Sequence, residues 1–185
     1  MKTKKMIGFI LIFLLFLQSP VCTFAGIQTG GFATGNLSYR LEYDSNFASA
    51  STIKGYIQRW NGISNQVSLS YTTSTANNQI SVNYMKVVPS NDSILGITHY
   101  YYNGNAVNNS STRNGAVCYV YKTSHTTPST SSARVVAYAT CVHEVGHALS
   151  LKHSSNKQDV MRQGNRTVTT PTNNDKSFLI MKWGN

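Results

Sequence analysis

Residues 143–153 read His-Glu-Val-Gly-His-Ala-Leu-Ser-Leu-Lys-His, and this stretch decides how the rest of the chain is interpreted. His143 and His147 are four residues apart, so on an α-helix both project from the same face, about one turn from each other. Two imidazoles placed in this way can direct ring nitrogens at one zinc ion. Glu144 sits beside the pair, where a carboxylate can reach a water at the metal without being a ligand itself.

His153 lies six residues after His147, too far to lie beside it on a continuing helix. If the chain turns after Leu149 or Ser150, His153 can return as a third ligand. Three neutral histidines leave a fourth tetrahedral position for water, which is the geometry of a catalytic zinc site. Histidines at i and i+4 also arise by accident on surfaces. Residues 133–142 favour the metal site, because they are mostly apolar, lack Pro and Gly, and predict the required helix.

The long form of this motif resembles that of the metzincin metallopeptidases, His-Glu-x-x-His-x-x-Gly-x-x-His followed by a methionine turn. Met161 follows His153 by eight residues, which is the spacing of the matrixin branch. An ordinary core methionine is the competing interpretation of Met161. The resemblance implies that Glu144 is the general base and that Met161 forms the turn beneath the metal. It also implies one catalytic Zn²⁺ with three ligands, His143, His147 and His153.

One position of the motif departs from the family pattern. Ser150 stands where the family has glycine, the residue that leaves a helix with a positive φ at no steric cost. A serine held in the left-handed region would carry strain of about 1–3 kcal/mol. The His- and Asp-rich loops that hold structural zinc and calcium in animal matrixins are also missing, so the sequence makes no prediction for calcium.

The resemblance extends loosely over residues 36–185 and implies an α+β, metzincin-like fold. In this fold a twisted mixed β-sheet of about five strands packs with a long active-site helix, a first helix and a C-terminal helix. The residue pattern predicts strands at about 36–43, 66–72, 79–87, 94–102 and 116–121. It predicts helices at about 50–64, from 133 to about 150, and from a first-turn proline at Pro171 onward. The resemblance implies that the strand containing Cys118 is the edge strand that lines the substrate cleft.

Residues 1–25 are typical of an export signal. Three lysines among the first five residues precede a hydrophobic run from Ile7 to Leu17, and Ala25 is a small residue suited to cleavage. An uncleaved anchor is the competing interpretation, although the run is short for a spanning helix. The sequence therefore predicts a signal peptide at 1–25 and a single metallopeptidase domain at 26–185. We expect a secreted, extracellular protein with no stable membrane insertion after cleavage.

Two cysteines, Cys118 and Cys141, remain after such a cleavage. In an oxidising extracellular setting an even number of cysteines indicates a disulfide. The matrixin-like arrangement packs the zinc helix under the sheet, so a bond between them is geometrically conceivable. Buried free thiols are an equally good interpretation, and the sequence leaves both open.

The chain is basic, with 16 Lys and Arg against 6 Asp and Glu and a formal net charge of +10. This balance favours a weak attraction to anionic surroundings such as cell-wall polymers, although a merely soluble basic surface is the simpler interpretation. Because no nucleic-acid motif accompanies the charge, no nucleic-acid partner is expected. We expect a monomer whose partner is a protein or peptide substrate.

These features favour a secreted zinc-dependent endopeptidase that hydrolyses peptide bonds through a zinc-activated water, with Glu144 as general base. The alternative from another class is a secreted zinc-stabilised binding module without peptidase activity. A purely structural site has no need of a carboxylate at position 144, which counts against that alternative. A cell-wall amidase that uses the same metal is a third interpretation.

Overall fold

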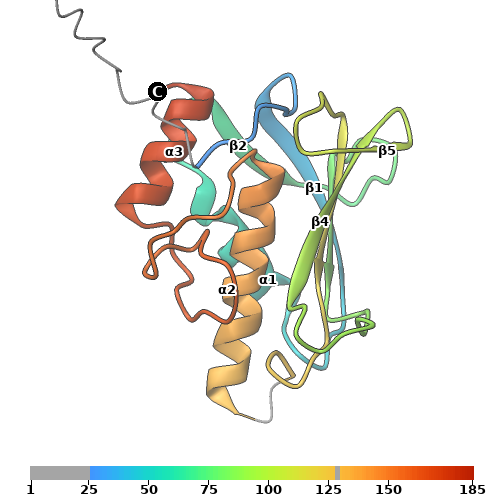
Figure 1. Ribbon diagram of the computed structural model, residues 1–185. Coiled ribbons are helices and arrows are strands. Elements are labelled where there is room, and N and C mark those ends of the chain that lie inside the picture. The colour runs from blue at the N-terminus through green and yellow to red at the C-terminus, as the bar shows by residue number, and fades with distance from the viewer. Residues whose placement is uncertain (1–25, 128–129) are drawn as a thin grey trace, which may run out of the picture.

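The computed structural model describes residues 26–127 and 130–185. The signal peptide predicted for residues 1–25 lies outside the described residues and stays a prediction. The described residues form one mixed sheet and three α-helices, which confirms the predicted α+β class (Figure 1). Within these residues, none of the helices combines the length and the apolar character that a membrane span requires.

The sheet has six strands in the order β2-β1-β3-β6-β4-β5, one more than the five expected. β1 is parallel to β2 and β3, and β3 is parallel to β6, whereas β4 is antiparallel to both β6 and β5. The additional strand, β5, has three residues, too few for a periodic pattern in the sequence. The strands are β1 Gly35–Tyr43, β2 Val67–Tyr71, β3 Ile80–Tyr84, β4 Gly96–Tyr102, β5 Asn105–Val107 and β6 Gly115–Val120.

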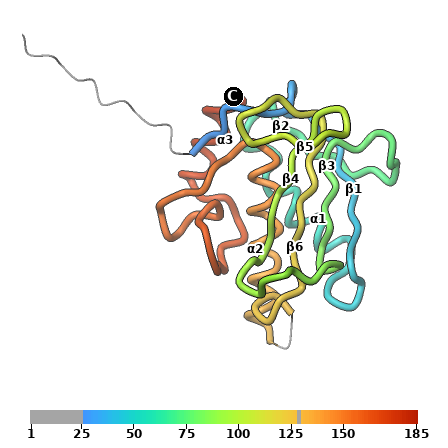
Figure 2. Tube along the Cα trace, turned by 45° about the vertical axis from the view of Figure 1, so that its right-hand side comes forward, coloured from blue at the N-terminus to red at the C-terminus, as the bar shows by residue number. Residues whose placement is uncertain are grey.

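The position of Cys118 corrects the expectation about the edge strand. Cys118 lies on β6, which is enclosed between β3 and β4, so its strand is not at an edge (Figure 2). The open edge belongs to β4 instead. β5 pairs only with Tyr100–Tyr102, and the described residues place no strand along the outer side of residues 96–99. Alternating hydrophobicity identifies a strand but does not identify its neighbours in a sheet. The prediction that the strand of Cys118 lies at the edge was therefore wrong.

Two of the three helices begin or end at residues other than those expected. α1 (Ala50–Ile57) continues only as a short 3₁₀ turn, η1 (Gln58–Trp60), so the first helix is shorter than predicted. α3 (Asn173–Trp183) begins after Thr172, whose side chain accepts a hydrogen bond from the backbone N–H of Asp175 in a capping box. Pro171 therefore precedes the N-cap and is not a first-turn residue.

The long helix α2 (Ser131–Ala148) lies against one face of the sheet, mainly over β6 and β4, and carries the first part of the motif (Figure 1). Its side chains are buried over almost the whole length, because α2 packs on the sheet, on α1 and on the irregular segment that follows it. Trp60 is fully buried and donates a hydrogen bond from Nε1 to the carbonyl oxygen of Val142 at 2.9 Å. This contact joins the end of η1 to the middle of α2.

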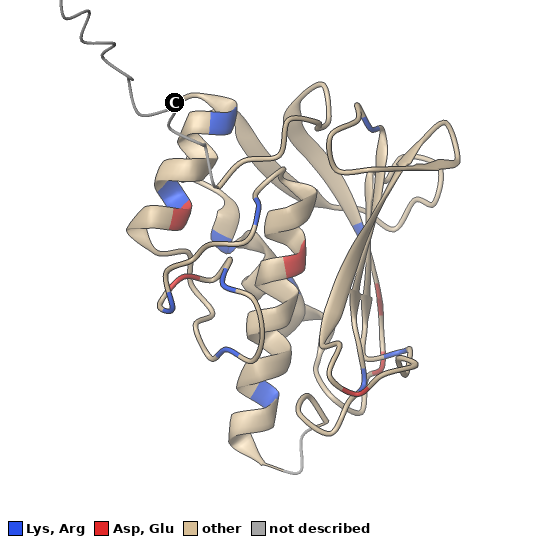
Figure 3. Cartoon of the chain, in the orientation of Figure 1, with Lys and Arg blue, Asp and Glu red and all other residues tan. Residues whose placement is uncertain are grey.

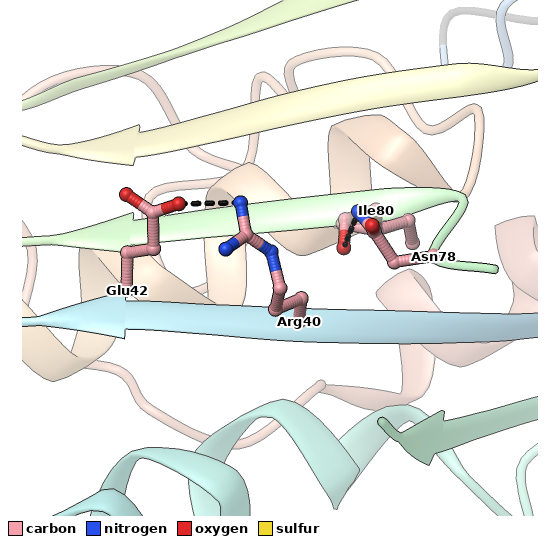
Figure 4. Close-up of polar contacts among 4 residues, drawn as sticks. All are labelled: Arg40, Glu42, Asn78 and Ile80. Atoms are coloured by element: carbon pink, nitrogen blue, oxygen red, sulfur yellow. Dashed lines mark hydrogen bonds and ion pairs between the residues drawn. The ribbon is translucent and has the colours of Figure 1, made fainter. Parts of the chain in front are cut away.

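Charged residues are sparse and are spread over the fold (Figure 3). Within the described part of the chain, the one ion pair joins Arg40 and Glu42, two half-buried residues on the same face of β1 (Figure 4). Beside it, Asn78 Nδ2 donates to the carbonyl oxygen of Ile80 at 3.4 Å. Such a partly exposed pair contributes little to stability. Because this is the one ion pair in the described residues, the basic residues around the motif have no described carboxylate oxygen within 4.0 Å.

Candidate metal centre

The three predicted ligands come together. His143, His147 and His153 each offer a ring nitrogen, and these nitrogens all lie within 4.8 Å of one another. The Nε2 atoms of His147 and His153 are 3.1 Å apart. Nitrogens at 2.0–2.1 Å from one tetrahedral zinc ion would be separated by about 3.3 Å, so the arrangement has the size that a shared ion requires.

Backbone carbonyls orient the two histidines of α2. Nδ1 of His143 is 2.8 Å from the carbonyl oxygen of Val160, and Nδ1 of His147 is 2.8 Å from that of Leu151. A carbonyl can only accept, so both Nδ1 atoms carry the proton and both Nε2 lone pairs are left for a metal. Burial lowers the pKa of His143 well below its usual value and that of His147 to about 4, so both rings are neutral at pH 7. Neutral, convergent imidazoles fit zinc.

The turn that returns His153 is at Ser150, one of the two positions where the sequence allows it. α2 ends at its C-cap, Leu149, and Ser150 follows with φ +73°, in the left-handed region. The strain expected for a non-glycine residue is therefore present. Hydrogen bonds hold this conformation: the Ser150 hydroxyl accepts from Arg113 Nη2 at 2.9 Å, and its carbonyl accepts from the backbone N–H of Gln28 at 2.7 Å. A glycine could not supply the first of these contacts.

Three residues far from the motif support this turn. Arg113 is buried with its guanidinium 3.9 Å from the centre of the Tyr100 ring, and its Nη2 also donates to Gln28 Oε1 at 2.8 Å. Gln28 Nε2 in turn donates to the Tyr100 hydroxyl and to the carbonyl of Leu151, at 2.8 and 3.0 Å. None of these residues carries a local pattern, so the sequence alone did not single them out.

The methionine of the motif lies against the inner side of α2. Met161 is buried, and a Cβ atom on Gly146 would lie 2.4 Å from its Sδ and 2.9 Å from Trp60 Cζ2. Glycine at position 146 therefore lets both side chains approach the helix. The buried carboxylate of Asp175 accepts hydrogen bonds from the backbone N–H groups of Val160 and Met161, at 2.9 and 3.2 Å. Because Val160 also contacts His143, α3 helps to orient a ligand.

Glu144 is buried beside the histidines and points towards β4. Its Oε2 accepts a hydrogen bond from the Thr98 hydroxyl at 2.8 Å, and a Cβ on Gly96 would lie 2.8 Å from its Oε1. Burial raises the pKa of Glu144 to about 7, against the opposing effects of the Thr98 hydrogen bond and the positive charge of Arg166. A carboxyl group with this pKa can both take up and release a proton near neutrality.

Comparisons with known proteins agree with this geometry. A family model described as "Peptidase_M10: Matrixin" matches residues 31–177. The chain belongs to the matrixin family. The solved structure entitled "Structure of myroilysin" is similar in fold, with a TM-score of 0.55 and 14% sequence identity over 86% of this chain and 98% of that chain. No curated protein matches the sequence. The resemblance to matrixins is thus confirmed, and the family together with the three histidines supports a zinc metallopeptidase.

Two cavities of this matrixin meet at the histidines. The larger, of about 510 Å³, lies along β4 and is lined by Gln28, Thr98, Tyr100, His147 and Lys152, among others. The smaller, of about 220 Å³, adjoins His143 and is lined by residues 93–96 and by Gln163, Gly164 and Arg166. Gly96, Glu144 and His153 line both cavities. A cleft therefore crosses the metal centre, with Glu144 at its middle.

The two cysteines are free, buried thiols in this matrixin, so the structure has the second of the two arrangements left open by the sequence. Cys118 Sγ donates towards the carbonyl oxygen of Glu144 at 3.4 Å. The disulfide does not form in the structure.

Proposed function

We propose that this matrixin is a secreted endopeptidase that depends on one zinc ion and cleaves extended peptide chains within the cleft. One observation carries the proposal: three neutral imidazole nitrogens converge beside a buried carboxylate at the middle of an open cleft. A structural zinc site would be closed by a fourth protein ligand. Among the residues that the structure describes, no further His, Cys, Asp or Glu joins the three histidines, and this together with the adjacent Glu144 favours catalysis.

Glu144 is the proposed general base. When bound, zinc would lower the pKa of water to about 7 and polarise the scissile carbonyl group. Glu144 would take a proton from the attacking water and later return it to the leaving amine. The Thr98 hydroxyl bonds to Oε2 and thereby holds the carboxylate in place between α2 and β4. Thr98 is in this scheme a positioning residue.

The proposed substrate lies along the open edge of β4. Residues 96–98 line the cleft, and no described strand pairs with their outer side. Free backbone N–H and C=O groups at such an edge can bind an extended peptide whatever its side chains. The edge of β4 thus takes the role that the sequence assigned to the strand of Cys118.

The test compares the exported protein with its Glu144→Gln variant. Both are assayed for zinc content and for cleavage of casein and of a mixed peptide library, with and without a chelator. We expect chelator-sensitive cleavage by the wild type, and a loss of at least ~10²-fold in Glu144→Gln with zinc retained, because only the general base is removed. Unchanged cleavage by the variant would remove Glu144 from the mechanism.

The remaining outcomes separate the alternatives. Stoichiometric zinc without cleavage of any peptide would favour the binding module, and cleavage confined to peptidoglycan stem peptides would favour the amidase. Secretion has its own test, since N-terminal sequencing of the protein from the culture medium should begin at Gly26. A chain that stays with the cells and begins at Met1 would contradict it.

A further inference from the structure

Arg166 is a buried guanidinium that no carboxylate neutralises. Its side chain is 5% exposed, and Nη1 donates to the carbonyl oxygens of Arg162 and Gly164, at 2.8 and 2.6 Å. Nε is buried and has no hydrogen-bond partner among the residues that the structure describes. Arg166 belongs to no ion pair in the described part of the chain. Burial of an unpaired charge is costly, so the position calls for an anion.

Arg166 is one of the residues that line the smaller cavity of the metal centre. On one side this cavity is bounded by His143, Glu144 and His153, and on another by residues 93–96 at the start of β4. Glu144 is the acidic residue among the described lining residues; its charge acts on Arg166 at a distance, but its Oε2 accepts from Thr98 and it forms no ion pair with the guanidinium. Within the described residues, a guanidinium without an ion pair therefore lies next to the reacting groups, at a cavity of about 220 Å³ that is suited to one side chain.

A purely structural role does not explain these features. A neutral side chain that donates to the carbonyl oxygens of Arg162 and Gly164, as Nη1 does, would be enough to hold this segment in place. The positive charge and the buried Nε would not be needed for that role. An apolar substrate side chain in the cavity would leave the charge unpaired and further desolvated. A carboxylate would accept hydrogen bonds from the planar guanidinium and neutralise it.

We propose that Arg166 is a specificity residue, and that it binds the carboxylate of an aspartate or glutamate directly beside the scissile bond of the substrate. The proposal rests on the proposed peptidase function and names the substrate class of the same site. The basic composition of the chain, with few acidic residues to compete for the pocket, agrees with an acidic substrate.

The first test changes the substrate and leaves the protein intact. Fluorogenic peptides are identical except at one of the two residues that flank the scissile bond, where Asp is compared with Asn and Glu with Gln. At one of these positions we expect kcat/KM to be about tenfold or more higher for the acid, the usual worth of a charge-assisted hydrogen bond. Cleavage with equal kcat/KM for acid and amide overturns the role of Arg166. No cleavage of any peptide would instead overturn the peptidase function itself.

The second test uses Arg166→Gln, which removes the charge and keeps an amide donor for the segment carbonyls. The acid-to-amide ratio of kcat/KM should fall to about one. Arg162→Gln is the matched control: it removes the same charge four residues earlier, where the guanidinium donates to the carbonyl of Lys157 and is outside the lining of the smaller cavity, and it should keep the wild-type ratio. If Arg166→Gln slows acid and amide peptides equally, the residue is structural and the proposal fails. Should the variant not fold, the wild-type comparison still decides.

Discussion

The ligand set is divided between two regions that are held in place by different means. His143 and His147 stand on α2, a helix of 18 residues that is buried against the sheet. His153 stands on the irregular segment 149–172, beside the helix (Figure 2). Helical periodicity alone sets the spacing of the first two rings. The position of the third depends on side chains that are distant in the sequence, Gln28 and Arg113 at the Ser150 turn, while Asp175 holds the backbone of the same segment at Val160 and Met161.

Polar contacts take the place of regular structure in the segment. Asp159 is buried and accepts hydrogen bonds from side chains at both ends of the segment and beyond it, those of Ser154, Asn156, Thr172 and Asn174. The two regions differ in what determines their geometry. The spacing of the two ligands on α2 follows from local helical periodicity, whereas the position of His153 is specified only by the complete fold. Each of the following variants tests this division.

Removal of one ligand from each region should have the largest effect. In both His147→Ala and His153→Ala we expect zinc affinity and peptidase activity to fall more than ~100-fold, beyond the cost of losing a mere supporting contact. Only His147→Ala should also lower the free energy of unfolding of the zinc-free protein, by about 0.5–1.5 kcal/mol, because it removes a partly buried hydrogen bond to Leu151. Zinc competition and urea unfolding measure the two effects. Equal destabilisation by both variants would contradict the division.

Loss of a distant support should come next. Asp175→Asn keeps one acceptor oxygen but removes the charge that binds the N–H groups of Val160 and Met161. We expect the free energy of unfolding to fall by about 2–4 kcal/mol, since hydrogen bonds to charged groups are worth about 1.5–3 kcal/mol each. Zinc affinity should fall about 10–100-fold, because Val160 orients His143. The control is Asp44→Asn, whose carboxylate accepts a hydrogen bond from the backbone N–H of Asn46 two residues away; it should leave zinc affinity unchanged and lower the free energy of unfolding by less than about 1 kcal/mol.

A smaller effect should separate two substitutions of Ser150. Both Ser150→Ala and Ser150→Gly remove the hydroxyl that Arg113 contacts, so they differ only in the backbone strain at φ +73°. Glycine adopts this conformation freely, and the glycine variant should be more stable than the alanine variant by about 1 kcal/mol. Urea unfolding of the zinc-free proteins measures the difference. Equal stability would mean that the turn is not strained.

The smallest effect is the order in which the rings take up protons in the zinc-free protein. Burial lowers the pKa of His147 to about 4, whereas His153 is exposed and its pKa is lowered less far. The folded-state pKa of His147 is below the value of 6.5 for the unfolded chain, so its stabilising effect is complete above pH 6.5 and is lost as the pH falls towards 4. NMR of the ring nitrogens should therefore show His153 protonated first. The reverse order would place His147 in contact with water.

Much of the helical region could be predicted from the sequence. The i, i+4 histidines, the apolar stretch before them and the spacing to Met161 are local patterns, and the structure brings these residues together as expected. The turn after the helix was also expected, together with its strain at Ser150. These features depend on periodicity and on residue type, which can be read along the chain.

The rest depends on contacts between distant segments. No local pattern indicates that Arg113 would reach Ser150, that Thr98 would reach Glu144, or that β4 rather than β6 would border the cleft. The glycines at 96 and 146 have no signal either, because the close approach they permit is visible only once the neighbouring elements are in place. Order within the sheet and the partners of buried polar groups are properties of the assembled fold.

The two thiols between α2 and the sheet have a consequence for how the protein can be made. Burial raises the pKa of Cys141 to about 12 and raises that of Cys118 as well, so neither forms a thiolate at neutral pH. Oxidation and thiol exchange proceed through the thiolate. The described residues therefore hold no disulfide whose formation would need an oxidase or a disulfide isomerase. We expect that the protein can be produced in a reducing compartment and handled in dithiothreitol with no loss of native structure.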